Sequence, residues 1–584
     1  MNRVSRVVLL VFLFSLLRGA CAAAPETGRA SGNPDVPDVV SRPLFVLYAS
    51  PSSRRLLQGE EIDLRARVNV WRDLLRARGA SYRILTHPDQ WKAVPPGVAI
   101  VLPSAYVLDE PERRLLTERL AAGDSLLATG LPGSLDESGK FAGVEFASEL
   151  FGPVTQPSEN ARDAQFLIVV GDTPLTYRLA AGSRLWIGKA SLGDRVTFRQ
   201  AGGGYVSDWS RRPGENGVFP FLADPKARRV LLGWTETLWS GKEGDLRTLA
   251  GAAVDWVEGR PVAYLATWPW PYRAAVTLGV DATWRFEHLP ALAQLLQRHG
   301  AAASFHLLAA DVEGQAALLT TLLAAGHDVA SLGDRWHPFA GLSGDDQSRR
   351  VAFSARSLNK ALGAGRAFAG LRAPEGATDV ATEKAVIQHG GSYLVDVGRV
   401  ESALPEFSTH GTLVLLPNTL NLEGGGATPA TQARRWRESL QGELARTLTL
   451  GGYAYIGVDA AALVPGGPLY GAFAGFLSSA RQMPALWLGK ATTVARWWQE
   501  RKRISLDSRV EGAYLVLTLN VDRGPPIDFP LALLIHPPPG KEHISLAEAM
   551  PEARLETAAD GRQVLVLKGL REGQHRLRLC FSQR

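Results

Sequence analysis

Cysteine is almost missing from this chain, which has only Cys21 and Cys580 among its 584 residues. Cys21 belongs to an N-terminal segment with the features of a signal peptide, and Cys580 lies near the end of the chain in the strand-like run RLRLCF. Once a signal is removed, one remaining thiol cannot form an internal disulfide or a paired-cysteine metal or redox site. Catalysis by a cysteine nucleophile is nearly excluded, because Cys580 stands four residues from the end of the chain within that strand-like run.

Runs of basic residues and long apolar runs are also missing. The formal net charge is +6, but Arg3, Arg6 and Arg18 lie in the N-terminal segment, and without them the net charge is +3. These charges are spread along the chain, so the sequence favours no nucleic-acid partner. No later apolar run approaches the ~20 residues of a spanning helix, so no integral membrane span is predicted.

The N-terminus has a basic start, an apolar run over Val7 to Leu17, and then GACAAAPE. An apolar core this short is typical of a secretory signal, and the A-x-A pattern around Cys21 provides a cleavage site. The sequence therefore predicts a signal peptide over residues 1–23, a Pro/Gly/Ser-rich flexible leader over 24–42, and a periplasmic or secreted protein. A lipidated Cys21 is the alternative, disfavoured because Arg18 stands where that signal needs an aliphatic residue.

Residues 43–260 alternate strand-like and helical patterns, with strand-like runs PLFVLYAS, SYRILT, VAIVLPSAYVLD and SLLATG. Such alternation predicts a parallel, doubly wound sheet. The segment resembles class I glutamine-amidotransferase-like domains, which are flavodoxin-like and place a nucleophile on a tight strand-to-helix turn. The corresponding turn here is PSAY, with Ala105 at the nucleophile position. The resemblance therefore implies a binding or spacer role rather than a working hydrolase site.

The proline-interrupted segment TWPWPYR lies near the start of a third region, which is predicted over residues 262–503. The remainder, residues 505–584, alternates apolar and polar residues between Gly/Pro turns, as in AYLVLTLNV and RQVLVLKGL. A period of two predicts strands, so this part is expected to be a small all-β domain. The whole chain is thus predicted to be α/β, with three domains after the leader.

Several motifs of the third region occur in a specific order: AAVTLGVDATW, ASFHLL, AGHDVASLGDRWHP, LSGDDQSRR, FAGLRAPEG and WLGKA followed by WW. In this order they resemble the polysaccharide deacetylases of the NodB-homology class, similar to carbohydrate esterase family 4. The resemblance implies a distorted (β/α) barrel short of eight units and a polysaccharide or oligosaccharide partner. It also implies N-acetyl hydrolysis by a divalent metal, such as zinc, at the carboxyl ends of barrel strands.

The resemblance implies a metal site that is incomplete in this chain. His337 matches the second metal histidine, whereas Leu332 stands at the position of the first. Asp281 ends its strand and is either the metal ligand, with the base lost at Gly279, or the base, with the metal ligand lost. Asp334 would be a substitute oxygen ligand if its loop is rearranged. Structural alternatives to these catalytic roles remain open. Asp281 could cap a turn, His337 could be a packed, hydrogen-bonded residue, and Asp334 could be a solvated carboxylate in a loop.

Other catalytic positions are implied by the same resemblance. Arg372 matches the arginine that orients the catalytic aspartate, and Glu375 replaces the aromatic residue that usually follows the proline. Asp396 falls near the motif that tunes the acid histidine, and Asp459 stands at the position of that histidine, as a substitute acid or a strand-end cap. His327, in the GHD turn, is expected to be structural.

These residues lead to three hypotheses. The protein is a divergent deacetylase that holds a divalent metal weakly, a pseudo-enzyme that binds an N-acetylated glycan, or a scaffold in polysaccharide assembly or export. In the first two cases, Asp281, His337, Arg372 and Asp459 are expected to lie together at the carboxyl mouth of the barrel.

Overall fold

The computed structural model describes residues 43–152, 154, 166–170, 173–186, 206–208, 221–224, 228–239, 244–283, 286–363, 368–396, 398, 403–422, 428–548, 550–558 and 561–583. The predicted signal peptide (1–23) and leader (24–42) lie outside these ranges. Within them, no helix combines the length and apolar character needed to cross a bilayer.

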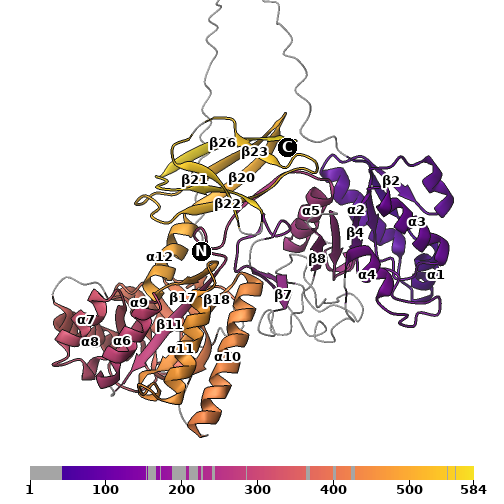
Figure 1. The fold of residues 1–584 in the computed structure, drawn as a ribbon. Coiled ribbons are helices and arrows are strands. Elements are labelled where there is room, and N and C mark those ends of the chain that lie inside the picture. The colour runs from indigo at the N-terminus through magenta and orange to yellow at the C-terminus, as the bar shows by residue number, and fades with distance from the viewer. Residues whose placement is uncertain are drawn as a thin grey trace, which may run out of the picture. The chain divides into compact units, whose positions relative to one another are not determined.

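The N-terminal part contains a six-stranded sheet in the order β2-β1-β3-β4-β9-β8. Its strands are β2 (Tyr82–Leu85), β1 (Phe45–Tyr48), β3 (Ala99–Leu102), β4 (Ser125–Thr129), β9 (Arg229–Leu232) and β8 (Phe221–Asp224). All pairings are parallel except β8 with β9. The helices around it are α1 (Pro51–Gly59), α2 (Leu64–Ala77), α3 (Glu110–Ala121), α4 (Glu145–Phe151) and α5 (Asp245–Val257) (Figure 1).

Alternate residues of β1 bury against two different cores. Phe45 and Leu47 pack in one cluster with α2 and α5, while Val46 and Tyr48 pack in another with α3 and α4. A strand that is apolar on both faces is expected where helices cover both sides of a parallel sheet. A small antiparallel sheet, β6 (Arg184–Trp186), β5 (Phe166–Val169) and β7 (Val206–Asp208), follows in the chain.

Ala105 lies in the turn after β3, as predicted from PSAY. The residue before it, Ser104, has left-handed backbone with φ of 46°. Ser104 is fully buried, and its Oγ donates to Glu236 Oε2 at 2.7 Å and accepts from Arg67 Nη1 at 2.7 Å. Bonds to two ionisable groups stabilise this non-glycine residue in a sparsely populated conformation.

Among the described residues, seven parallel strands close into a barrel in the order β11-β12-β13-β14-β15-β17-β18, because β11 pairs with both β12 and β18. They are β11 (Ala274–Ala282), β12 (Ser304–Leu308), β13 (Asp328–Gly333), β14 (Gly370–Arg372), β15 (Tyr393–Asp396), β17 (Val414–Leu422) and β18 (Tyr453–Asp459). Strand β19 (Leu486–Leu488) pairs with the start of β11, and β16 (Glu406–Phe407) runs antiparallel to β17. The predicted barrel with fewer than eight units is confirmed.

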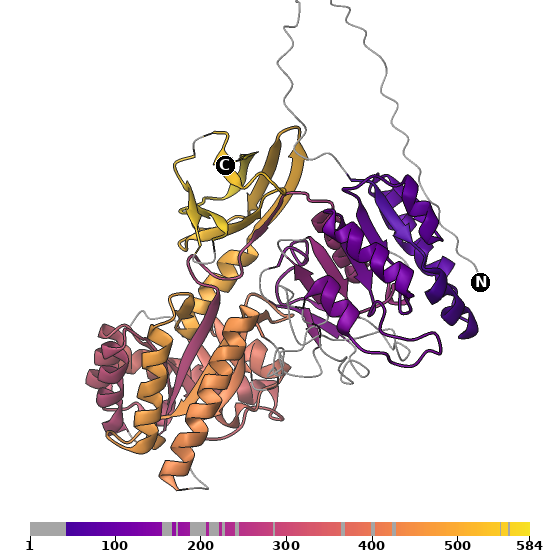
Figure 2. The same ribbon diagram turned by 45° about the vertical axis from the view of Figure 1, so that its right-hand side comes forward.

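Helices surround the barrel: α6 (Leu289–Arg298), α7 (Ala316–Ala324), α8 (Gly344–Leu362), α9 (Val380–Gln388), α10 (Pro429–Leu450), α11 (Pro468–Arg481) and α12 (Ala491–Lys502) (Figures 1 and 2). Alternation along β11 explains this layer. Val276, Leu278 and Val280 join the core shared with α6, α10 and α11. The intervening residues, including Gly279 and Asp281, face the barrel interior, since successive side chains of a strand point to opposite faces.

Two four-stranded antiparallel sheets make up the C-terminal part. One contains β20 (Ile504–Glu511), β21 (Tyr514–Val521), β26 (Gly573–Ser582) and β23 (His543–Leu546). The other contains β22 (Leu531–His536), β25 (Gln563–Leu567) and β24 (Ala553–Thr557), together with β10 (Val262–Leu265) from before the barrel. The boundary at residue 262 stays a prediction, but β10 forms its sheet with the C-terminal segment.

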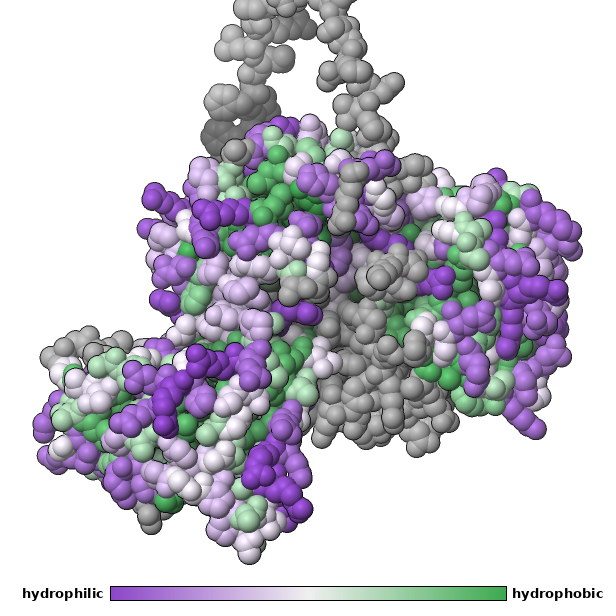
Figure 3. Space-filling view, in the orientation of Figure 1, coloured by the Kyte–Doolittle hydropathy of each residue, from purple (hydrophilic) through white to green (hydrophobic). Residues whose placement is uncertain are grey.

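The visible surface is mixed in character. Hydrophilic residues cover much of the N-terminal sheet region, and over the barrel they are interspersed with hydrophobic ones (Figure 3). Trp336 is the only tryptophan among the exposed large hydrophobic residues of the described ranges, with 49% of its surface accessible.

Candidate functional site

A cavity of about 600 Å³ opens at the carboxyl ends of the barrel strands. This cavity, called the barrel pocket below, is formed by the ends of β11, β14, β17 and β18 and by the segments that follow β13 and β14. It is lined by Asp281, Thr283, Trp336, Arg372, Ala373, Glu375, Gly376, Asn421, Leu422, Gly457 and Asp459. Three of the residues expected at the mouth, Asp281, Arg372 and Asp459, therefore share one pocket.

The central contact of the pocket is an ion pair between Asp281 and Arg372. Arg372 Nε lies 2.7 Å from Asp281 Oδ1 and 2.8 Å from Oδ2, and Arg372 Nη2 donates to Asn421 Oδ1 at 2.9 Å. Arg372 is only 8% exposed. Burial alone lowers the pKa of Arg372, but the adjacent Asp281 carboxylate offsets this effect and the pKa ends above its ordinary value. The guanidinium is therefore permanently charged and holds the carboxylate in one orientation.

Two glycines make room for this ion pair. A Cβ at Gly457 would lie 2.8 Å from Arg372 Nη2 and 2.5 Å from Asn421 Oδ1. A Cβ at Gly279 would lie 1.8 Å from the Tyr455 hydroxyl oxygen. The Tyr455 hydroxyl thus occupies the space that a side chain at position 279 would need. An aspartate acting as the catalytic base at this position would fit only if Tyr455 moved.

His306, on β12, forms a buried polar layer in the barrel interior with two tyrosines. Its Nε2 lies 3.0 Å from the Tyr393 hydroxyl, and its Nδ1 lies 3.4 Å from the Tyr455 hydroxyl. Complete burial, reinforced by the charge of Arg372, holds the pKa of His306 well below its usual value. The sequence analysis did not select His306 as a site residue. The sequence ASFHLL does contain a signal for this position. Phe305 and Leu307 face the helices, so His306 between them must face the barrel interior.

Leu332 and His337, the two positions matched to metal histidines, lie in different surroundings. Leu332 is 1% exposed, at a register shift where Leu307 pairs with Ser331 and Leu308 with Gly333. His337 is exposed, with Nδ1 3.0 Å from its neighbour's carbonyl oxygen on Pro338, and it is not among the residues that line the barrel pocket.

Asp334 has a structural contact instead of a place in the pocket. Arg350 Nε on α8 lies 2.6 Å from Asp334 Oδ1, and Arg350 also donates to the carbonyl oxygens of His337 and Pro338, each at 2.7 Å. One buried guanidinium therefore holds the segment that carries both proposed ligands.

Asp396 and Asp459 lie at strand ends in different surroundings. Asp459 lines the barrel pocket and also caps the turn after β18, because its Oδ1 accepts from Ala461 N at 2.9 Å. Both suggested roles of Asp459, site residue and strand-end cap, are therefore compatible with its position. Asp396 Oδ1 accepts from Gly398 N at 2.9 Å, and Asp396 is not part of the pocket lining. His327 is 2% exposed, with its Nδ1 accepting from Ala303 N at 3.2 Å.

The residues present do not fit a divalent-metal site. Over the described ranges, no group of three or more His, Cys, Asp or Glu side chains is placed to hold an ion, and Asp281, Asp334 and His337 form no such group. A zinc site needs three or four ligands around one point. Asp281 is already bound to Arg372, Asp334 to Arg350, and Leu332 offers no donor. The roles assigned to these residues from the sequence stay predictions.

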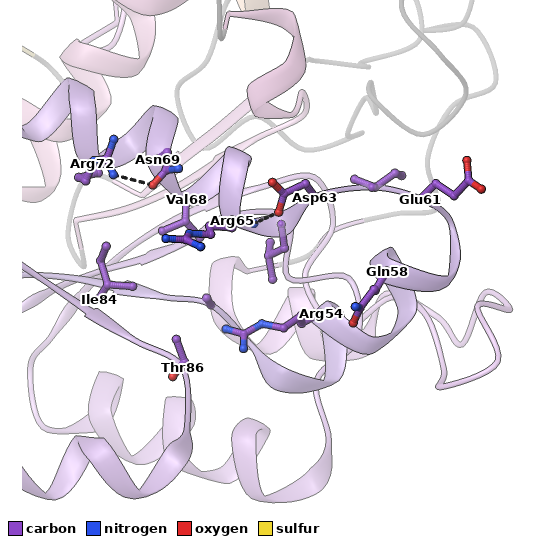
Figure 4. Close-up of a pocket in the computed structure, with 13 residues that line it drawn as sticks. Arg54, Gln58, Glu61, Asp63, Arg65, Val68, Asn69, Arg72, Ile84 and Thr86 are labelled. Carbon is purple, nitrogen blue, oxygen red and sulfur yellow. Dashed lines mark hydrogen bonds between the residues drawn. The ribbon is translucent and has the colours of Figure 1, made fainter.

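A second cavity, of about 620 Å³, lies in the N-terminal part at the ends of β1 and β2 (Figure 4). Arg54 from α1 and Arg65 from α2 reach into this space, and Asn69 accepts a 2.8 Å hydrogen bond from Arg72 (Figure 4). Asp63 caps α2 by accepting from Arg65 N at 2.8 Å. This cavity is mainly a gap between two helices and an edge strand, with exposed charged residues around it.

One protein-family model matches part of the barrel region. Residues 272–394 match the family model described as polysaccharide deacetylase, so the chain contains a polysaccharide deacetylase domain. The resemblance stated for this region is thereby confirmed. The match does not extend to residues 43–260, where the amidotransferase-like resemblance stays a prediction. No curated protein matches the chain.

Several solved structures are similar to the chain. A probable polysaccharide deacetylase from Pseudomonas aeruginosa PAO1 has 15% identity and a TM-score of 0.35, over 40% of this chain and 92% of that one. A CE4 family pseudoenzyme from Bacillus anthracis has 14% identity and a TM-score of 0.27, over 38% of this chain and 66% of that one. Agd3, described as a novel carbohydrate deacetylase, has 11% identity and a TM-score of 0.40, over 92% of this chain and 98% of that one.

Proposed function

We propose that this protein binds an N-acetylated glycan in the barrel pocket, and that its metal site is too incomplete for efficient deacetylation. The observation that carries the proposal is the pocket itself, which lies where barrel folds bind their ligands. It combines the exposed aromatic Trp336 with hydrogen-bonding groups from Asn421 and Asp459. An aromatic face beside a few polar groups suits a sugar ring, which has apolar faces and a polar edge.

The degenerate metal site is the second half of the proposal. It is supported by the burial of Leu332, by the exposed position of His337, and by the Arg350 ion pair that engages Asp334. Metal-assisted hydrolysis of an amide at this site would need a Lewis acid and an activated water. The residues that the structure describes include no group of three or more His, Cys, Asp or Glu side chains placed to hold the ion. Binding needs neither.

A divergent deacetylase is the second candidate, because one catalytic feature of the family is retained. The Asp281 carboxylate is oriented by the buried Arg372, and Asp459 lies in the same pocket. In this candidate Asp281 takes a proton from the attacking water and Asp459 gives one to the leaving amine. Such a reaction would be much slower than one assisted by a metal, which supplies several kcal/mol of charge stabilisation.

The experiment separates the two candidates by measuring binding and acetate release on the same samples. Isothermal titration with an N-acetylglucosamine tetramer is expected to give binding that survives chelation with EDTA and is lost in Trp336→Ala. Acetate release is expected to stay at background, with or without added zinc or cobalt. Metal-dependent release that is abolished by Asp281→Asn and by His337→Ala would refute the degenerate site.

We further propose that the protein is exported, that residues 43–260 form a flavodoxin-like domain and that residues 505–584 form an all-β domain. The strand order β2-β1-β3-β4-β9 supports the second statement, because it is the flavodoxin order. The antiparallel sheets after residue 503 support the third. The basic and apolar N-terminus supports export. Secretion of the full chain, with cleavage read by mass spectrometry of the mature N-terminus, tests export.

A further inference from the structure

The charge of the barrel pocket identifies a narrower class of ligand, and this inference rests on the proposed function. The lining contains three carboxylates, Asp281, Glu375 and Asp459, against one guanidinium, Arg372. Arg372 contacts both oxygens of Asp281, so this pair is nearly neutral as a unit. The remaining two carboxylates leave the described part of the lining with two formal negative charges.

Glu375 is available to a ligand. It is exposed, it lines the pocket, and it makes no hydrogen bond or ion pair with any described residue. Its backbone has φ of 57°, in the left-handed region that non-glycine residues rarely adopt, within the short helical turn Pro374–Gly376 after β14. Asp459 uses one oxygen as a cap and has no other hydrogen bond among the described residues.

Trp336 provides an independent feature that points to the same kind of ligand. Its exposed indole lies on the segment after β13 and belongs to the same lining as the two carboxylates. Tryptophan is the best aromatic partner for an organic cation, because the face of its ring carries negative potential. Aromatic face and carboxylates together favour an ammonium group, and neither feature requires a metal.

We propose that the barrel pocket selects a cationic amino sugar, that is, a glycan whose acetyl groups have already been removed from some residues. An amino sugar carries the ammonium group that the two carboxylates and the indole would bind, together with the ring that fits a cavity of about 600 Å³. A fully N-acetylated glycan has no charge to offer. The protein would thus act as a receptor for partly deacetylated polysaccharide, the product of an amide-hydrolysing step carried out by another enzyme.

The test compares two ligands that differ only in the acetyl groups. Isothermal titration of the full chain with a glucosamine tetramer and an N-acetylglucosamine tetramer is done at about pH 6, below the ~7.7 pKa of an ordinary α-amino group. We expect the glucosamine tetramer to bind about tenfold more tightly, and its affinity to fall as salt is raised, because salt screens exposed charges. The N-acetylated tetramer should show little salt dependence.

Variants locate the effect in the pocket. Glu375→Gln and Asp459→Asn keep the shape of each side chain, and Asn can still cap the turn after β18. Each is expected to weaken the glucosamine tetramer about three- to tenfold, and the acetylated tetramer clearly less. Glu438→Gln, a neutralisation on the outer face of α10 at a side chain that is 69% exposed, is the matched control and should have no effect. Trp336→Ala should weaken both tetramers, and the charged one more.

Other results would refute either the charge selection or the glycan binding. Equal or tighter binding of the acetylated tetramer refutes the charge selection but leaves the proposed glycan binding intact. No binding of either tetramer refutes the proposed function as well. Equal weakening by Glu438→Gln would show non-specific charge attraction. A lysine tetrapeptide that binds as tightly as the glucosamine tetramer would refute a glycan as the ligand and favour a basic peptide.

Discussion

Replacing Arg372 with methionine is expected to destabilise the barrel by about 3–5 kcal/mol, the usual cost of removing one partner of a buried ion pair. The side chains of Arg372 and Asp281 are 9% and 15% exposed, so water cannot replace the lost guanidinium fully. Methionine fills much of the same volume, which keeps the cavity contribution small. The main cost is therefore the Asp281 carboxylate left without its cation. A smaller cost comes from Asn421 Oδ1, which loses one of its two donors and keeps Asn418 Nδ2.

The chain has more than one cooperative part, so a single unfolding transition would not report this change. Hydrogen exchange followed by mass spectrometry gives the opening free energy of peptides from β11 and β14 separately. These peptides should lose protection by a factor of about 10² to 4 × 10³, from the 1.4 kcal/mol per tenfold conversion. Peptides from β21 and β26 are the internal control and should not change.

A double variant decides whether the lost charge is the cause. Arg372→Met together with Asp281→Asn removes both charges, and we expect it to recover more than half of the protection lost in Arg372→Met alone. A cost below about 1 kcal/mol for the single variant would refute the reasoning. So would a double variant that is as unstable as the sum of the two single ones, because the pair would then not be coupled.

Three further predictions concern groups on the barrel axis and in the N-terminal part. His306 stays neutral in the folded chain because burial lowers its pKa. The free energy of unfolding should therefore fall as pH drops below ~6.5, the ordinary pKa of histidine, by up to ~1.4 kcal/mol per pH unit. His306→Gln should flatten this slope in acid unfolding curves. Gly279→Ala should cost about 1–3 kcal/mol through the clash with Tyr455, measured by exchange of β11. Glu236→Gln should cost about 1–3 kcal/mol, seen in exchange of β3 and β4, because its oxygens accept from the buried Ser104 and Trp71. If one of these variants has no effect on stability, the structural role given to that residue is refuted.

Much of the barrel could be predicted from the sequence because its information is local. The order of the motifs, through the resemblance that it carries, implied the barrel. Asp281, Arg372 and Asp459 lie at the ends of strands of one parallel sheet, which places them at one mouth. What could not be predicted depended on distant contacts. The loop after β13 is held by Arg350 from α8, and nothing in the sequence around His337 signals that its imidazole lies outside the pocket.

Other differences have the same origin. Strand β10 precedes the barrel in the chain yet completes a sheet with β22, a pairing across more than 260 residues that periodicity cannot reveal. The strained residue at the turn after β3 is Ser104, because a buried carboxylate from the distant Glu236 stabilises it there. The polar interior around His306 depends on barrel closure, which brings Tyr393 and Tyr455 to the same imidazole.

The degenerate metal site is tested most directly by the metal content of the purified full chain. Elemental analysis by mass spectrometry, after expression with zinc and cobalt present and removal of loosely held ions by dialysis, counts bound metal per chain. We predict well under one equivalent, because Leu332 supplies no donor and Asp334 is engaged by Arg350. One tightly held equivalent, lost in both Asp281→Asn and His337→Ala, would contradict the degenerate site and with it the proposal that this barrel binds its glycan without a metal.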